Sequence, residues 1–206
     1  MRLVSLNTWK CDGEYSRRLA AMEAGLGALA ADVILLQEDF WAPDFDLHTA
    51  GRLGDALGLS CHSVPLRKKD RVVEGAVVRS FSGLSVLSRF PVLWNRTIDL
   101  PTHPDDGERS SQAVCLESSA GPLLVINLHL THLSEAGELR RKQLAATLEA
   151  PRGGTFSAAW WSAAISTQAP MALGLPKMTV SPMCVACWMS STSPHCRTAR
   201  PVSIIS

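Results

Sequence analysis

The stretch Leu123-Leu124-Val125-Ile126-Asn127-Leu128-His129 is the strongest strand signal in the chain. It follows Gly121-Pro122, a pair typical of turns, and it is rich in residues that favour strands. An uninterrupted apolar run of this length is typical of a strand buried on both faces. His129 therefore comes at the carboxyl end of a buried strand, where side chains from separate segments can meet in a cleft.

The segments before and after this strand alternate between helix and strand signals. Glu135 to Glu149 consists of good helix formers, with Ser134 as a candidate N-cap and Leu144 and Leu148 on one face. Toward the N-terminus the predicted strands are Leu3–Asn7, Val33–Leu36, Leu84–Ser88, a short strand at Val92 and Ala113–Glu117, and the predicted helices are Glu14–Ala31 and Arg52–Leu59. This alternation predicts an α/β (α+β) fold class.

Composition favours a single domain with a sizeable core, because 46% of the 206 residues are hydrophobic. The formal net charge of +1 gives no global field that points to or away from a nucleic-acid partner. No apolar run is long enough to span a bilayer, and the N-terminus becomes polar too early for a signal peptide. We therefore expect a cytoplasmic monomer whose six cysteines are reduced thiols.

The composition changes abruptly after Ala150. All nineteen acidic residues precede Pro151, whereas Ser, Pro, Met, Trp and Cys are enriched after it and the hydrophobic pattern loses its period. We therefore separate a domain at 1–150 from a tail at 151–206. The tail is expected to be poorly ordered, with Trp160, Trp161 and Trp188 exposed.

Three polar residues, Asn7, Glu38 and His129, come where predicted strands end. Magnesium takes oxygen ligands, and Glu38 with the Asn7 amide oxygen suits that role, while a histidine beside a phosphate can serve proton transfer or charge stabilisation. Taken singly, Glu38 is better explained as a solvated carboxylate at a strand end, and His129 as a hydrogen-bonded residue of the core or its rim. His132 is expected at the surface.

Two further patterns have ordinary explanations. Arg140 to Gln143 is expected to be the solvated face of the last helix. Cys184 and Cys187 followed by His195-Cys196 imitate a zinc site, but the turn pattern of such sites is absent. A tail that binds a metal or a partner is nevertheless an alternative function, which native mass spectrometry with zinc would test.

Motifs in a fixed order point to one family: Leu6-Asn7-Thr8-Trp9, Leu35-Leu36-Gln37-Glu38, Gly83-Leu84-Ser85-Val86-Leu87-Ser88-Arg89-Phe90-Pro91 and Asn127-Leu128-His129-Leu130, then Arg140 and Gln143. The chain resembles the endonuclease/exonuclease/phosphatase superfamily over residues 1–150. The resemblance implies a four-layer αββα sandwich, here without its C-terminal part.

The resemblance also implies a metal-dependent phosphoesterase or phosphodiesterase that uses Mg2+ or Mn2+. In that case Glu38 is the principal metal ligand, Asn7 a further ligand or orienting residue, and His129 the histidine beside the scissile phosphate. The substrate is a phosphoester of a class that the sequence leaves open: nucleic acid, lipid headgroup or soluble phosphate.

Two motifs that the family mechanism requires do not occur. They are Gly-Asp-X-Asn after the last helix, whose Asp positions the attacking water, and a terminal Asp-His pair; no acidic residue follows Glu149. We therefore expect this chain to be inactive. The alternative is a catalytically dead member that binds a metal or a phosphorylated ligand.

A shift of reading frame near Pro151 explains the loss. When the third base of each codon from Ala159 to Gln168 is grouped with the first two bases of the next, suitable synonymous codons read Val-Val-Val-Gly-Gly-Asp-Phe-Asn-Ala. This is a buried strand followed by the missing motif. The sequence therefore predicts that the tail is a frameshifted product.

Overall fold

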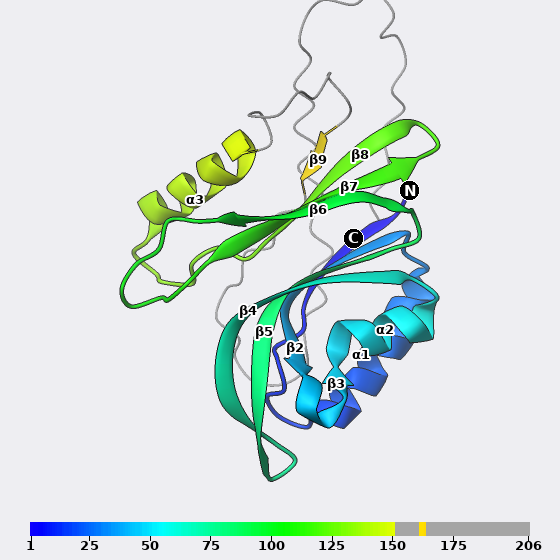
Figure 1. The fold of residues 1–206 in the computed structure, drawn as a ribbon, viewed down its shortest axis with the longest axis vertical. Helices are drawn as coiled ribbons and strands as arrows, with labels where there is room; N and C mark the ends of the chain where they lie inside the picture. The colour runs from blue at the N-terminus through cyan, green and yellow to red at the C-terminus, as the bar shows by residue number, and fades with distance from the viewer. Residues whose placement is uncertain (151–160, 164–206) are drawn as a thin grey trace, which may run out of the picture.

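Two β-sheets form the centre of the molecule, in a computed structural model that describes residues 1–150 and the backbone of 161–163 (Figure 1). The first sheet has the order β1-β2-β5-β4, with β3 paired to β2, and the second has the order β6-β7-β8-β9. The strands are β1 (Leu3–Asn7), β2 (Val33–Ala42), β3 (Leu47–His48), β4 (Ser60–Val73), β5 (Ala76–Ser88), β6 (Val92–Asp99), β7 (Ser110–Ser118), β8 (Gly121–Leu128) and β9 (Trp161–Ala163).

Helices cover the outer faces of both sheets (Figure 1). The helices α1 (Tyr15–Leu29) and α2 (Thr49–Leu57) pack on the first sheet, and α3 (Gly137–Glu149) packs on the second. A 3-10 turn, η1 (Pro43–Phe45), follows β2. The predicted α/β class and its four-layer αββα arrangement are confirmed.

The continuous apolar run of β2 is explained by burial on both faces. Val33 and Leu35 point into the layer between the sheets, where they join β5 and the inner faces of β7 and β8. Ile34 and Leu36 point the other way, into the core beneath α1 and α2. Full burial of each such side chain contributes on the order of 1.5–3 kcal/mol. Because its alternate residues lie in different cores, β2 joins the two cores.

A polar network crosses the otherwise apolar layer between the sheets. Gln37 is 1% exposed and Asn127 is 0% exposed, and Gln37 Nε2 donates to Asn127 Oδ1 at 2.8 Å. Asn127 Nδ2 donates to the carbonyl oxygens of Leu36 at 2.8 Å and Ser85 at 3.0 Å. These bonds tie β8 to β2 and β5 at one register and satisfy the Asn127 amide, which is costly to bury unpaired, whereas Gln37 Oε1 has no partner among the described residues.

Several predicted boundaries were wrong. β2 does not end before Gln37 but continues to Ala42, because its buried residues resume at Phe40 and Ala42 after a bulge. The helix α2 begins at Thr49 rather than Arg52, and Ser134 is not a cap, since Ala136 precedes α3 and no side chain caps it.

The long antiparallel pair β4 and β5 went largely unpredicted. The two strands pair from Ser60↔Ser88 to Val73↔Ala76, and in Figure 1 they reach far beyond the neighbouring strands as a ribbon. The strand β4 is half-buried or exposed at every residue except Val73, and it contains the charged run from Arg67 to Arg71, so it has no apolar period that a sequence pattern would reveal.

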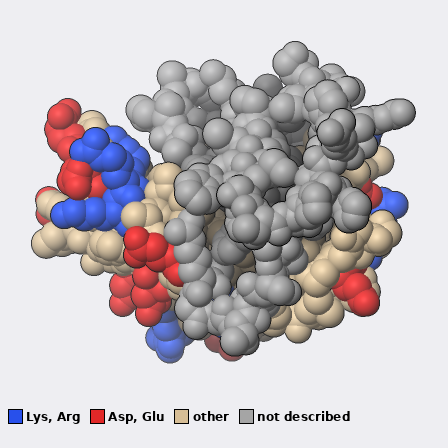
Figure 2. All heavy atoms as spheres, turned by 90° about the horizontal axis from the view of Figure 1, so that it is seen from above, with Lys and Arg blue, Asp and Glu red and all other residues tan. Residues whose placement is uncertain are grey.

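The chain after Ala150 contributes one described element, β9, which pairs parallel to β8 with Leu124↔Trp161 and Ile126↔Ala163 in register. Apart from β9, residues 151–206 lie outside the described part of the chain, so the predicted disorder of this segment and the predicted exposure of its tryptophans stay predictions. Within the described part, no helix is long and apolar enough to cross a membrane. On the face drawn in Figure 2, basic and acidic side chains are interspersed over the described surface.

Candidate functional site

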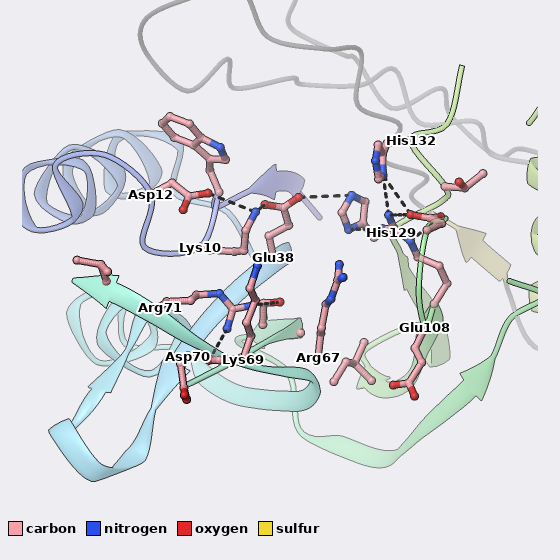
Figure 3. Close-up of a pocket in the computed structure, with 18 of the residues that line it drawn as sticks. Lys10, Asp12, Glu38, Arg67, Lys69, Asp70, Arg71, Glu108, His129 and His132 are labelled. Atoms are coloured by element: carbon pink, nitrogen blue, oxygen red, sulfur yellow. Dashed lines mark hydrogen bonds and ion pairs between the residues drawn. The ribbon is translucent and has the colours of Figure 1, made fainter. Parts of the chain in front are cut away.

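A cleft of about 1200 Å3 lies where the ends of both sheets meet the β4–β5 ribbon. Residues from β2, from the segment after β8 and from the loop after β1 face into it, as the labelled side chains of Figure 3 show. Glu38 and His129 line it, and Asn7, at the end of β1, is outside the lining but close enough for its side chain to interact with Glu38. The structure thus brings the three predicted site residues together.

Glu38 occupies the bulge in β2. Its φ of 54° lies in the left-handed region, and the pairing register with β5 shifts between Gln37 and Asp39. For a residue other than glycine this conformation costs on the order of 1–3 kcal/mol, and bulges commonly re-aim a side chain beside a site. The bulge turns the Glu38 carboxylate into the cleft instead of into the sheet.

The Glu38 carboxylate is held in its ionised form. Lys10 Nζ donates to its Oε2 at 2.6 Å, and the side chain is 17% exposed. Burial acts to raise the pKa of Glu38, but the hydrogen bond and charge of Lys10, with His129 and Asn7, outweigh burial and lower this pKa. At neutral pH the cleft therefore contains a fixed negative charge.

Asn7 is oriented by the backbone that follows it. Its Oδ1 accepts a hydrogen bond from the Trp9 amide at 2.8 Å, which directs its buried Nδ2 away from that turn. No acceptor among the described residues meets hydrogen-bond geometry with Nδ2. Because Asn7 also helps to lower the pKa of Glu38, its amide nitrogen faces that carboxylate.

His129 follows β8 directly and faces Glu38 from the second sheet. Its Nε2 lies 3.8 Å from Glu38 Oε1, and Arg109 Nη1 lies 3.2 Å from its Nδ1. Arginine has only donors, so Nδ1 is the unprotonated nitrogen and Nε2 carries the hydrogen. Burial, and next the Arg109 charge, lower the pKa of His129 to about 4, so the ring is neutral at pH 7.

A buried ion pair supports both histidines. Arg109 bonds both carboxylate oxygens of Asp106, at 2.5 and 3.0 Å, and the Asp106 side chain is 0% exposed. Burial acts to raise the pKa of Asp106, but hydrogen bonds from Arg109 and Thr131 outweigh it and lower the pKa. His132 Nδ1 lies 3.1 Å from Asp106 Oδ1, while the His132 side chain is 61% exposed, as expected for a surface residue.

Arg140 and Gln143 do not form a solvated face, contrary to the sequence-based expectation. Gln143 is 0% exposed; it accepts from the Thr131 amide at 3.0 Å and donates to Pro101 O at 2.8 Å. Arg140 donates to the carbonyl of Leu133 at 2.6 Å. Both residues therefore fix the loop after His129 against α3.

Sequence patterns gave no signal for Lys10, Asp106 or Arg109. Each lies in a loop without periodicity, and each acquires its role only when the two sheets are brought together. The buried structural carboxylate Asp39 was also missed: it accepts from the Ala50 amide at 2.9 Å and from Ser85 Oγ at 2.5 Å.

No group of three or more His, Cys, Asp or Glu side chains that could hold a metal occurs within residues 1–150. Cys11, Cys61 and Cys115 are free thiols, as predicted for these three. The Cys184, Cys187 and His195-Cys196 pattern lies outside the described residues.

The family assignment follows from comparison with known proteins. The model of the Endonuclease/Exonuclease/phosphatase family matches residues 4–165, so the chain belongs to this family. It therefore has the fold of a class of phosphoesterases. A search of curated proteins finds no match.

Solved structures share the fold. An endonuclease/exonuclease/phosphatase from Beutenbergia cavernae DSM 12333 is 24% identical, with a TM-score of 0.52 over 72% of this chain and 43% of that one. The human Nocturnin catalytic domain with bound sulfate is 19% identical, with a TM-score of 0.55 over 74% and 58%. TDP2 of D. rerio with single-strand DNA product is 19% identical, with a TM-score of 0.53 over 73% and 54%. The chain spans about half the length of these proteins.

Proposed function

We propose that the intact form of this protein is a divalent-metal-dependent phosphoesterase whose site lies in the cleft between the sheets. The observation that carries the proposal is the convergence of Glu38, from the first sheet, with His129, from the second, at 3.8 Å. Family membership supports phosphoester hydrolysis as the reaction class.

The donor set fits a hard cation that keeps most of its water. Glu38 supplies one ionised carboxylate, and the buried Asn7 amide lies beside it without a hydrogen-bond acceptor for its nitrogen. Magnesium is bound in this way, by one or two carboxylates with waters and substrate phosphate, whereas zinc favours closed sets of nitrogen and sulfur ligands. Glu38 would hold the ion once Lys10 Nζ has given up its contact with Glu38 Oε2 at 2.6 Å. Asn7 would orient the Glu38 carboxylate. When bound, Mg2+ or Mn2+ would stabilise negative charge on the phosphoryl oxygens.

His129 has a defined part in this proposal. Its neutral ring directs an Nε2 hydrogen toward the side of the cleft where Glu38 lies, and Arg109 holds the opposite nitrogen. Such a donor stabilises charge that develops on a phosphoryl oxygen, and its position is fixed before the reaction begins. Arg109 is a positioning residue, which acts through His129.

We also propose that the 206-residue chain itself does not hydrolyse phosphoesters. Its sequence contains no Asp or Glu after Glu149, so no carboxylate from that part can activate water. The position of β9, parallel to β8, supports the frameshift proposal, because the regrouped codons place a Val-rich strand with the missing motif at this point. For the 206-residue chain, the second candidate function is binding of a metal or a phosphorylated ligand by a catalytically dead member of the family.

Calorimetric titration with Mn2+ tests the metal site. The 206-residue chain and a frame-restored chain should both bind the ion, and Glu38→Gln should weaken binding at least tenfold, because the ligand loses its charge. Asp44→Asn is the matched control, since Asp44 lies on the surface outside the cleft. Equal affinities of the Glu38 and Asp44 variants would return Glu38 to the role of a solvated carboxylate.

A further inference from the structure

One face of β4 carries a row of three basic side chains, Arg67, Lys69 and Arg71, which we call the cationic row. All three line the cleft. They alternate along the strand, paired with Ser82, Ser80 and Val78 of β5, so they share one face of the ribbon. Figure 3 shows Arg67 and Lys69 pointing from β4 into the cleft, on the side of Glu38.

The charges of the cationic row are not neutralised within the described part of the chain. Neither Arg67 nor Lys69 has an ion pair or side-chain hydrogen bond there. Of the other cations that line the cleft, Lys10 is paired with Glu38 and Arg109 with Asp106, while Arg140 is bonded to the carbonyls of Leu133 and Ser134. Asp70, between them in sequence, is paired with Arg79 at 3.6 Å on the ribbon. Among the carboxylates that line the described cleft, Asp12, Glu38, Asp70 and Asp106 each have an ion pair and Glu108 has none. The three charges of the row therefore still exceed the unpaired negative charge beside the site.

Arg71 is fixed in place rather than free in solvent. Its Nη1 donates to Ser80 Oγ at 2.9 Å and its Nη2 to Ser82 Oγ at 3.0 Å, while no carboxylate pairs with it. Burial, together with the charge of Arg67, lowers the pKa of Arg71 and outweighs the nearby Cys11, Asp12 and Glu38, which raise it. A half-buried guanidinium that is held by hydroxyl groups and faces a second cation is stabilised by an anion between them.

An exposed aromatic ring lies on another wall of the same cleft. Trp9 lines the cleft and is 43% exposed, although tryptophan is usually well buried. Its indole is supported from behind by the Arg18 guanidinium, 5.0 Å from the ring centre, and Arg18 is itself bonded to the carbonyls of Thr8 and Lys10. The ring is thus a preorganised flat surface.

We propose that the cleft binds a single-stranded nucleic acid, with successive phosphates on the cationic row and a base stacked on Trp9. The proposal rests on the proposed function, since it names the substrate class of the same site. A positively charged track combined with an aromatic platform is the combination by which single strands are bound without sequence preference. Alternate residues of a strand are about 6.7 Å apart, a spacing comparable with that of neighbouring phosphates in an extended nucleotide chain.

Salt dependence measures the number of phosphates that are neutralised. For single strands, log K falls with log salt with a slope of about −0.7 per neutralised phosphate. Three contacts give a slope of about −2, which is a loss of affinity of about 18-fold between 50 and 200 mM salt, whereas two contacts give a loss of about sevenfold.

The experiment is fluorescence anisotropy of a labelled eight-residue oligothymidylate with the 206-residue chain in EDTA. Arg67→Met and Lys69→Met should each reduce the slope by about 0.7, and Trp9→Ala should weaken binding roughly tenfold at all salt concentrations. Lys68→Met is the matched control, because Lys68 lies over the ring of Phe81 and outside the cleft lining. It should keep the wild-type slope.

Arg67 and Lys69 carry the test because their side chains make no bond within residues 1–150 that folding could lose. An unchanged slope in the Arg67→Met, Lys69→Met double variant would overturn the proposal, as would absence of binding at 20 mM salt. Stronger competition by duplex DNA, ATP or anionic lipid vesicles than by unlabelled oligothymidylate would assign the row to another ligand and likewise overturn it. In EDTA, Glu38→Gln should bind the oligonucleotide at least as well as wild type, because the substitution removes a negative charge from the cleft. Failure of the metal proposal would appear in the Mn2+ titration and not in this assay, so the two failures can be told apart.

Discussion

Replacement of Asn127 by leucine should cost about 3–6 kcal/mol of folding stability. The side chain is fully buried and makes three hydrogen bonds, with Gln37, Leu36 O and Ser85 O. Leucine has the same number and branching of side-chain heavy atoms, so it leaves no cavity. The loss comes from the three bonds and from the two carbonyl oxygens that lose this donor, whereas Gln37 Nε2 keeps its bond to Ser5 Oγ at 3.1 Å. A net hydrogen bond contributes about 0.5–1.5 kcal/mol, and each buried group that is orphaned costs about 1–3 kcal/mol. The total approaches the entire stability of a typical domain.

Urea denaturation followed by far-ultraviolet circular dichroism measures this loss from the change in midpoint at constant m-value. Asn95→Leu is the matched control. Asn95 lies exposed on β6 and accepts one bond, from Gln112 Nε2 at 3.2 Å, and Gln112 keeps its second partner, His62 O. The control should lose no more than about 1 kcal/mol. If both variants lost the same amount, the network would not be what holds β8 to the first sheet.

Three other predictions concern the site and the gene. In a frame-restored chain, His129→Ala should lower turnover by about two to four orders of magnitude, and a greater loss in His132→Ala would show that the histidines were assigned wrongly. The pKa of His129 is lowered from 6.5 to about 4, so the unfolded chain binds more protons between these values. Stability should accordingly decrease by about 3 kcal/mol as the pH falls from 6.5 to 4, and His129→Gln, compared by urea denaturation at each pH, should remove this part of the dependence. Sequencing the gene decides the frameshift: a codon other than ATT at Ile165, or a Ser166 codon not ending in A, contradicts it, and restoring the frame should yield metal-dependent hydrolysis that the 206-residue chain lacks.

Apolar period was enough to predict the strands that are buried on both faces. Val33–Leu36 and Leu123–Leu128 were found in this way, as was the long helix α1, because burial leaves an unbroken or periodic pattern in the sequence. The ordered motifs then predicted the four layers. The edge strand β4 has only one buried residue, and its second half carries the charged run from Arg67 to Arg71, so it has no such pattern.

The site was predictable only where a residue ends or interrupts a buried strand. Asn7, Glu38 and His129 met that condition, although Glu38 lies in a bulge within β2 rather than at its end. Lys10 and Arg109 did not, since both lie in loops and their role depends on contacts across the cleft. The cationic row was hidden for a related reason: Lys68 and Asp70 interleave with its members, so the sequence shows one mixed charged run in which the alternation of the strand cannot be seen.

The geometry of the site depends on how the two sheets pack. Glu38 and the cationic row belong to the first sheet, whereas His129 belongs to the second, and the hydrogen bond between Gln37 and Asn127 lies within two residues of both site residues. Because packed interiors adopt discrete arrangements, this register sets the 3.8 Å separation of His129 from Glu38 more firmly than any loop can. The described residues bring to the cleft groups that suit the binding of a phosphoester and the stabilisation of its charge: an ionised carboxylate, a hydrogen-bond donor, a row of cations and an aromatic ring. Under the proposed function, the chain as written should retain affinity for a metal ion and for a single strand without hydrolysing a phosphoester, since no acidic residue follows Glu149. Binding without turnover is thus the outcome that distinguishes a frame change after a sound domain from a chain that has lost its fold.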